Sequence, residues 1–294
     1  MKEILKKLRK YEIRVRKAIN SQMQGDFQSI FKGSGLEFDD VRQYQYGDDI
    51  RTIDWNTSAK GHGTFVKTYK EEKEQTVFFL LDVSASQEIG SNGQQKIDVA
   101  KEITSLLSIA ALKESSQVGL LCYSDQREKY IKPAKGARHS FEIVNALFTL
   151  KPKSKKTDLT SAMKYLMNIL RRKSVVFVIS DFVDEDYFHS LKGLAKKHDL
   201  IVIQIYDQRE SMFPDLGIVP LFEKESGKNI WVNTSSTGFR NALDKTYTSN
   251  TKALEDFCRR SDANYLAIDT RKDYVSDLIK LFTLRNKKSA QRAR

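Results

Sequence analysis

The sequence predicts a three-layer α/β domain with a mostly parallel central sheet, and three observations support this prediction. From residue 74 onward, short apolar runs alternate with segments of helical periodicity. Two of these runs, residues 174–180 and 200–206, are rich in β-branched residues, as expected of strands that are buried on both faces. No internal repeat interrupts the alternation. Strands that alternate with helices favour a parallel sheet with helices on its two faces.

The predicted elements follow one another along the chain. Residues 75–83 form a continuous apolar strand, and Ile97, Ala100 and Ile103 begin a helical spacing that continues to residue 112. Further strands are expected at residues 118–123, 129–131, 174–180, 200–206 and 265–269. Further helices are expected at residues 141–150, 159–170, 187–197, 252–261 and 274–284. Residues 217–233 suggest a hairpin that turns at residues 225–228.

The segment before the domain differs in composition. Apolar residues at positions 4, 8, 11, 15 and 19 lie on one stripe of a predicted basic helix. Residues 25–73 contain many glycines, aspartates and aromatics, which indicate loops and short extended pieces, with a strand at 64–69. We expect residues 1–73 to pack on the domain at 74–285, because they contain too little apolar material for a core of their own. A basic tail, 286–294, completes the predicted organisation.

Composition excludes several classes of protein. With 294 residues and 40% hydrophobic composition, the chain can bury a sizeable core. Its apolar runs are far shorter than the roughly 20 residues that cross a bilayer, and the lysines near the start interrupt any signal-peptide core. We therefore expect a cytosolic protein without a transmembrane segment. The two cysteines, Cys122 and Cys258, have no CxxC partner and are expected to be buried reduced thiols.

The net charge of +12 suggests nucleic-acid binding until its distribution is considered. Residues 1–22 carry a net charge of +6 and residues 285–294 carry +5, which leaves only +1 for the rest of the chain. A protein that binds a duplex usually has a basic face within its fold. The sequence therefore predicts no nucleic-acid partner, and the basic termini are interpreted as a solvated helix face and a frayed tail.

Oxygen-bearing side chains follow two of the predicted buried strands. Asp82, Ser84 and Ser86 leave the first strand at a spacing of two, which places them on one side of the exit loop. Asp181 ends the strand at 174–180, and Thr157 stands ahead of the preceding helix. In an open parallel sheet, ligands gather outside the carboxyl ends of the strands. We expect these five oxygen groups to meet there.

The donor set favours a hard cation. Magnesium prefers oxygen ligands and usually keeps several waters, whereas zinc prefers nitrogen and sulfur. The four histidines show neither HxxxH nor HExxH spacing. The sequence therefore predicts Mg²⁺, or Mn²⁺, bound weakly by the five residues.

These residues also carry a family resemblance. The DxSxS pattern of Asp82, Ser84 and Ser86, followed by Thr157 and by Asp181 after a strand, resembles the metal-ion-dependent adhesion site of von Willebrand factor A domains. The upstream stretch from residue 33 to 55, which includes GSGLEF, DVR and GDDIRTIDW, is similar to the signature of the MoxR-associated "domain of unknown function 58" proteins. The two stretches together cover residues 33–181.

The resemblance implies a von Willebrand factor A-like fold and a bacterial adaptor that works beside a MoxR-type AAA+ ATPase. In such a site the metal keeps an open position for an acidic residue of the partner, so it serves binding rather than catalysis. Two differences from the A-domain pattern stand out. Lys155 and Lys156 precede Thr157 where glycines are common, and Gln87 replaces a common methionine. The two lysines could weaken metal binding, or they could attract an acidic partner, which is the ATPase or its client.

Other interpretations of the same residues stay open. A magnesium-dependent phosphatase-like hydrolase would use Asp82 as phosphoryl acceptor, although it would want a second acid where Ser84 stands. A metal-free scaffold would use the motif only to cap the following helix. The upstream Asp48, Asp49 and Asp54 are best explained by loop turns and by pairing with nearby arginines. The sequence names neither the client nor the oligomeric state.

Overall fold

The computed structural model describes residues 6, 32–61, 63–91, 94–184, 186–210, 216–223 and 228–292. Within this part of the chain, a six-stranded sheet has the strand order β12-β9-β8-β3-β6-β7. The strands are β3 (Thr76–Asp82), β6 (Gln117–Tyr123), β7 (Arg127–Ala134), β8 (Val175–Ser180), β9 (Asp199–Tyr206) and β12 (Asn264–Asp269). β7 runs antiparallel to β6, and the other neighbours are parallel. The predicted mostly parallel sheet is confirmed.

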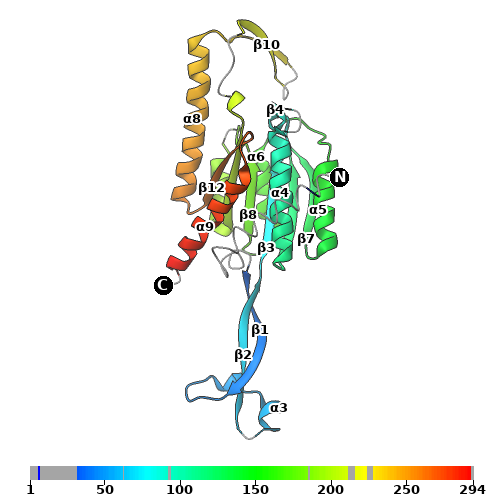
Figure 1. Cartoon of the computed structure of the whole chain (residues 1–294), viewed down its shortest axis with the longest axis vertical. Helices are drawn as coiled ribbons and strands as arrows, with labels where there is room; N and C mark the ends of the chain where they lie inside the picture. Colours follow the sequence, from blue (N-terminus) through cyan, green and yellow to red (C-terminus); the bar gives the residue numbers. More distant parts are fainter. Residues whose placement is uncertain are drawn as a thin grey trace.

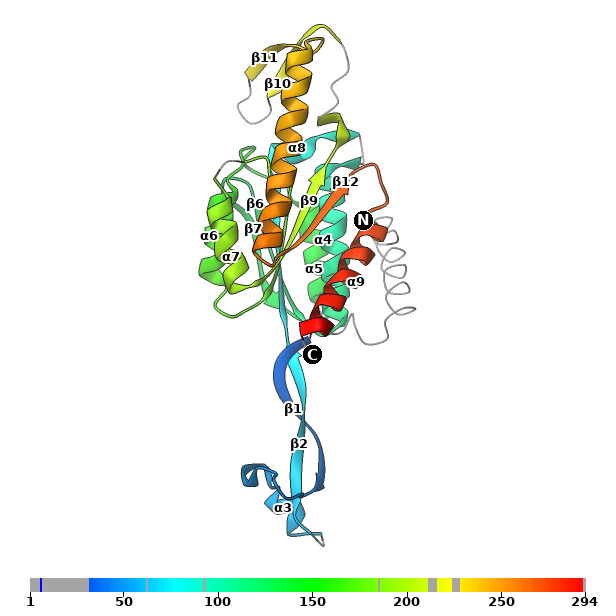
Figure 2. The ribbon, with the colours of Figure 1, turned by 90° about the vertical axis from the view of Figure 1, so that its left-hand side faces the viewer.

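Helices cover both faces of this sheet (Figures 1 and 2). One face carries α4 (Lys96–Lys113), α5 (Ala137–Thr149) and α9 (Tyr274–Arg292), and the other carries α6 (Leu159–Ile169), α7 (Phe188–Lys197) and α8 (Thr237–Arg260). The alternation of side chains along the central strand builds both cores. Phe79 joins the first core, where its ring stacks on Phe177 with centroids 4.9 Å apart. Phe78 joins the second core.

A glycine is required at one point in the centre of the sheet. Gly119 of β6 lies directly opposite Phe78 of β3 in the parallel register. A Cβ atom at position 119 would collide with the ring of Phe78 and would lie 3.0 Å from the side chain of Pro133. The glycine therefore makes room for the ring within the second core.

The amino-terminal extension differs from its expected arrangement. β1 (Lys32–Gln43) and β2 (Phe65–Glu74) pair as a two-stranded antiparallel ribbon. We expected this segment to pack on the domain, but the ribbon projects away from it, and its far end carries α3 (Trp55–Ser58) (Figures 1 and 2). The cause is local, since only Gln75 separates β2 from β3 and the ribbon leaves along the strand direction. Of the predicted N-terminal helix, only Lys6 lies within the described residues.

At the opposite end of the domain, α8 runs beyond the sheet toward a hairpin of β10 (Ile218–Glu223) and β11 (Lys228–Asn233) (Figure 2). The hairpin was predicted. α8 begins at Thr237, much earlier than the expected residue 252, and the Ser236 side chain caps its first turn. Gly238 and several threonines give the first half of this helix a low helix propensity, which hides it in the sequence.

The predicted tail at 286–294 also needs correction. α9 continues to Arg292, since the residues that follow Arg285 include good helix formers and neither glycine nor proline to stop the helix. Among the described residues, no helix has both the length and the apolar character that crossing a bilayer requires.

Candidate functional site

The exit of β3 brings the first three predicted residues together. Asp82 is 3% exposed and Ser84 is 1% exposed, at the start of the 3-10 turn η2 (Ala85–Glu88). The backbone N–H of Ser84 donates to Asp82 Oδ1 at 2.9 Å. Ser84 stands at the N-cap position of η2 but makes no side-chain capping bond, and its Oγ lies 3.0 Å from Ser86 Oγ instead. Helix capping therefore does not explain Ser84, and the two hydroxyls face one another.

Asp181 reaches the same edge from the neighbouring strand. β3 and β8 pair in parallel with Leu81 opposite Ile179, so their exits adjoin. Ser180 donates its hydroxyl to Asp82 Oδ2 at 2.7 Å. Burial, and then the negative charge of Asp181, raises the pKa of Asp82 to about 6. Asp82 and Asp181 are therefore close enough for their charges to interact, as the sequence predicted.

The turn that presents Asp181 is strained. Phe182 has a φ of +59°, a left-handed conformation that is an outlier for a bulky residue. The turn is held by two local hydrogen bonds, from Phe182 N to Ser180 Oγ at 3.0 Å and from Val183 N to Asp181 Oδ1 at 3.2 Å. It turns the Asp181 side chain back onto its own loop and leaves Val183 exposed.

Backbone hydrogen bonds fix the loop that contains Thr157, one before and one after that residue in the chain. The carbonyl of Lys155 accepts from the backbone N–H of Ala85 in η2 at 3.0 Å. The backbone N–H of Asp158 donates to the carbonyl of Ser124 at the exit of β6. These bonds place Thr157 beside the Asp82 exit, while Lys155 and Lys156 are exposed at its rim. The seven predicted residues thus share one edge of the sheet.

A buried lysine is the main feature that sequence reasoning missed. Lys96, the first residue of α4, is fully buried, and its Nζ lies 2.7 Å from Asp181 Oδ2. It also pairs with Glu210 of the 3-10 turn η3 (Gln208–Glu210). Burial alone would lower the pKa of Lys96, but the charges of Asp181 and Glu210 outweigh it and raise that pKa.

One signal in the sequence could have revealed this lysine. A positive charge at a helix N-terminus is unfavourable because it faces the positive end of the helix dipole. Lys96 is the first residue of α4, and buried apolar residues follow it. A lysine in that position needs nearby carboxylates. No spacing in the sequence indicates that one of them is Glu210.

The donors at this edge fit a hard divalent cation. Hydroxyls of Ser84 and Ser86 face one another beside two carboxylates, and nitrogen or sulfur ligands are absent from the set. Among the described residues, no group of three or more His, Cys, Asp or Glu side chains forms a metal cluster, so the hydroxyls are essential to such a site. The buried Gln87 donates to Asp82 Oδ2 at 3.2 Å, whereas its Oε1 has no partner in the described part of the chain. A hydrated cation would supply donors for such an orphaned oxygen.

The upstream acidic residues are structural, as predicted, and lie at the far end of the ribbon (Figure 1). Asp48 pairs with Arg42 at 2.7 Å. Asp49 accepts from the backbone N–H of Arg51 at 3.0 Å, and Asp54 caps α3. They are remote from the carboxyl edge of the sheet and do not join the candidate site.

The thiol prediction also holds. Cys122 and Cys258 are free and buried. Burial raises the pKa of both thiols to about 12, which keeps them protonated and unreactive.

One family model matches most of the chain, and it names no activity. The family model described as "Protein of unknown function DUF58" matches residues 40–253. The uncharacterized protein Rv1480 of Mycobacterium tuberculosis is 24% identical over 283 residues, which cover 95% of this chain and 89% of the relative. The uncharacterized protein Mb1516 of Mycobacterium bovis matches with the same identity and coverage.

Solved structures that match this chain do so with TM-scores below 0.5. An aerotolerance-related membrane protein from Bacteroides fragilis has a TM-score of 0.49 and 14% identity, covering 73% of this chain and 99% of its own. BatB from Bacteroides thetaiotaomicron has a TM-score of 0.46 and 13% identity, with the same coverage. The SpRpn10 VWA domain has a TM-score of 0.38 and 14% identity, covering 70% of this chain and 93% of its own.

Proposed function

We propose, from the premise that this chain belongs to the DUF58 family of proteins of unknown function, that it is a metal-dependent protein-interaction module and not an enzyme. Its carboxyl-edge site would hold Mg²⁺ or Mn²⁺ and dock an acidic residue of a protein partner. The partner proposed here is a MoxR-type AAA+ ATPase or its client, met in the cytosol.

One observation carries this proposal most directly. The hydroxyl oxygens of Ser84 and Ser86 lie 3.0 Å apart. Ligands bound at about 2.0–2.1 Å in octahedral geometry lie about 3 Å from their neighbours around Mg²⁺. The two serines therefore already have the spacing of adjacent ligands. Asp82, Asp181 and Thr157 would supply the other oxygens, directly or through water.

The charge of the site also favours a divalent cation. Asp181 and Glu210 both contact the single buried ammonium of Lys96, and the charge of Asp82 interacts with that of Asp181. With all four groups ionised, the cluster has an excess of two negative charges. Buried charge without compensation is costly. One Mg²⁺ or Mn²⁺ would neutralise that excess, and it would bind weakly because Lys96 repels it.

Binding is favoured over hydrolysis by the surroundings of Asp82. A phosphoryl acceptor needs a carboxylate oxygen that is free to attack. Both oxygens of Asp82 already accept hydrogen bonds, from Ser84, Ser180 and Gln87, and the residue is nearly inaccessible. Asp82 Oδ1 accepts only one of these bonds, so it keeps a lone pair with which to hold the cation, while a docked carboxylate would contact the open face of that cation.

The surroundings of the edge suit a protein partner. Lys155 and Lys156 are exposed at its rim and would steer an acidic surface toward the cation. The hairpin at the same end of the domain exposes Ile218, Ile230 and Trp231. Aromatic residues are enriched in protein interfaces. An interface centred on the edge would therefore combine a charged contact with apolar area.

A metal-free scaffold remains the second candidate, and a specific observation favours it. The ammonium of Lys96 already sits against Asp181, where it supplies positive charge without a metal. In that case the edge would be a fixed structural unit. The two candidates predict different effects of a chelator. Removal of the cation would abolish partner binding by the metal-dependent module but not by the scaffold.

A pull-down from native lysate with the tagged full-length chain tests the proposal. Wild type in Mg²⁺ should capture the ATPase, while chelator or Asp82→Ala should abolish capture. Glu142→Ala, an exposed carboxylate on α5, is the matched control and should behave as wild type. Equal capture in all four samples would rule out docking through the metal. Turnover of p-nitrophenyl phosphate by wild type but not by Asp82→Ala would favour the hydrolase.

A further inference from the structure

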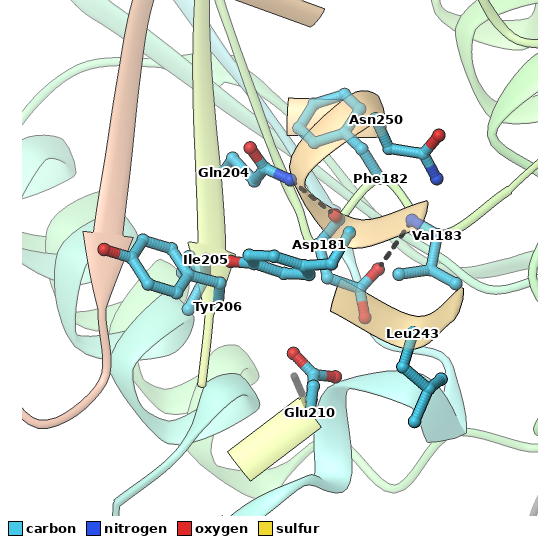
Figure 3. A pocket seen from close by; sticks show the side chains of 10 residues that line it. Asp181, Phe182, Val183, Gln204, Ile205, Tyr206, Glu210, Leu243 and Asn250 are labelled. Carbon is cyan, nitrogen blue, oxygen red and sulfur yellow. Dashed lines mark hydrogen bonds between the residues drawn. The ribbon is translucent and has the colours of Figure 1, made fainter. Parts of the chain in front are cut away.

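A pocket of about 190 Å³ opens beside the candidate metal site (Figure 3). Asp181 and Glu210, the two carboxylates that Lys96 joins, form one side of it. Apolar side chains contribute most of the rest, among them Val183, Ile205 and Leu243. The pocket therefore shares Asp181 with the site described above but has a different, largely apolar character.

Four separate parts of the fold converge to form the pocket, and one of them is η3 with Glu210. The strained turn after β8 contributes Asp181 and Val183, the end of β9 contributes Ile205, and α8 contributes Leu243 from the side. The same turn thus presents one side chain to the metal edge and exposes another at the pocket. Val183 is 58% exposed, so its side chain is accessible from solvent at the rim of the pocket.

The size of the pocket restricts its occupant. Pockets for cofactors and drug-sized ligands have volumes of roughly 300–1,000 Å³, so about 190 Å³ is too small for them. An apolar cavity of roughly 150 Å³ accepts a benzene molecule. The pocket therefore suits a single bulky side chain.

We propose that this pocket receives a bulky apolar side chain, such as phenylalanine or leucine, that lies next to the acidic residue docked at the metal. The ligand class is a short partner segment with an acidic residue beside a bulky apolar one. This inference rests on the proposed function, since the acidic residue is held by the cation. The negative charges of Asp181 and Glu210 exclude an acidic side chain from the pocket itself. The acidic residue of the partner therefore contacts the cation, and the apolar residue enters the pocket.

The polar wall of the pocket is preorganised. Lys96 binds Asp181 and Glu210 together, and Gln204 donates to the backbone carbonyl of Asp181 at 3.2 Å. These bonds fix the wall before a ligand arrives, which lowers the entropic cost of binding. They also link the occupied pocket to the carboxylate that faces the metal.

Three capped dipeptides test the inference with the full-length chain in Mn²⁺. The probes are acetyl-Asp-Phe-amide, acetyl-Asp-Ala-amide and acetyl-Asn-Phe-amide, with affinity and Mn²⁺-induced relaxation of the peptide protons measured by NMR. Burial of a phenyl ring contributes enough free energy for at least a tenfold preference, so the Asp-Phe probe should bind about tenfold or more tightly than the Asp-Ala probe. Its ring protons should be relaxed by the metal, and the Asn-Phe probe should bind weakly.

Two variants locate the contact. Val183→Gln, at the exposed rim, and Leu243→Gln, on α8, should each reduce the preference for phenylalanine while Mn²⁺ binding stays unchanged, because neither variant adds charge beside Asp181. Ala253→Gln places the same side chain on an exposed position of α8 and should have no effect. Equal binding of the Asp-Phe and Asp-Ala probes in Mn²⁺, or an unaltered preference in both pocket variants, would overturn the pocket but leave metal docking intact. Failure of wild type to bind Mn²⁺ would overturn the proposed function, and the pocket inference with it.

Discussion

Lys96 Nζ lies 2.7 Å from Asp181 Oδ2, and both side chains are almost completely buried. The pair joins the first residue of α4 to the loop after β8, so one salt bridge spans the candidate site. Asp181 therefore has two candidate cations, the ammonium that it already contacts and a divalent ion. The balance between them determines how strongly a metal can bind.

Lys96→Met should shift that balance. Removal of one partner from a buried ion pair costs about 3–5 kcal/mol, so in chelator the variant should unfold at a lower temperature than wild type. Mn²⁺ should restore more stability to the variant than to wild type, because the excess negative charge has grown. Differential scanning calorimetry with and without Mn²⁺ measures both effects. The exposed Lys164→Met on α6 is the control, and an equal response to Mn²⁺ in all three proteins would refute this account of Lys96.

Charge reversal at Lys155 and Lys156 should slow partner association. Both side chains are exposed, so their effect is on steering and is screened by salt. In the double variant Lys155→Glu and Lys156→Glu, the association rate should fall several-fold at low salt and should approach that of wild type near 1 M salt. Surface plasmon resonance with the captured ATPase measures these rates. An unchanged rate at low salt would mean that the partner does not approach over this loop.

Gly119→Ala should destabilise the domain by about 1–3 kcal/mol, since the added methyl group overpacks a full core. The ring of Phe78 and the side chain of Pro133 leave it no space. Urea unfolding measures the loss. Gly238→Ala on α8, where a Cβ meets only Ser236 Oγ at 3.6 Å, should be neutral or slightly stabilising. If Gly119→Ala unfolds at the same urea midpoint as wild type, the prediction is wrong and the two strands move apart to make room for the methyl group.

Limited proteolysis should cut the β1–β2 ribbon before the domain. An isolated two-stranded ribbon is only marginally stable in water, and this one projects from the body (Figure 2). Trypsin should therefore yield a resistant fragment that begins between Lys60 and Gln75. This outcome is the reverse of what a packed extension would give. An intact ribbon after the domain has begun to be cut would favour packing of the extension.

Much of the fold could be predicted from the sequence because its signals are local. Buried strands such as β3 and β8 appear as apolar runs, and the period-two spacing after β3 places Asp82 and Ser84 together. Parallel pairing then brings Asp181 to the same edge. The direction of the ribbon could not be predicted, because it depends on how β2 continues into β3 and not on composition.

The rest of the site depends on tertiary contacts between distant segments. Lys96 and Glu210 are separated by more than one hundred residues, and their side chains meet where the start of α4 comes close to η3. The pocket likewise needs α8 to lie over the ends of β8 and β9, and no pattern in the sequence indicates where that helix packs. Sequence patterns reveal which residues an element buries, but they do not reveal which element it meets.

The central claim is that Asp82, Ser84 and Asp181 hold a divalent cation at the carboxyl edge of the sheet. Titration of the full-length chain with Mn²⁺, followed by electron paramagnetic resonance and calorimetry, tests it most directly. Wild type should bind one ion per chain, displaceable by Mg²⁺, and Asp82→Ala should lose that binding while Glu142→Ala keeps it. Unchanged Mn²⁺ binding in Asp82→Ala, or no bound ion in wild type at millimolar Mn²⁺, would contradict the account.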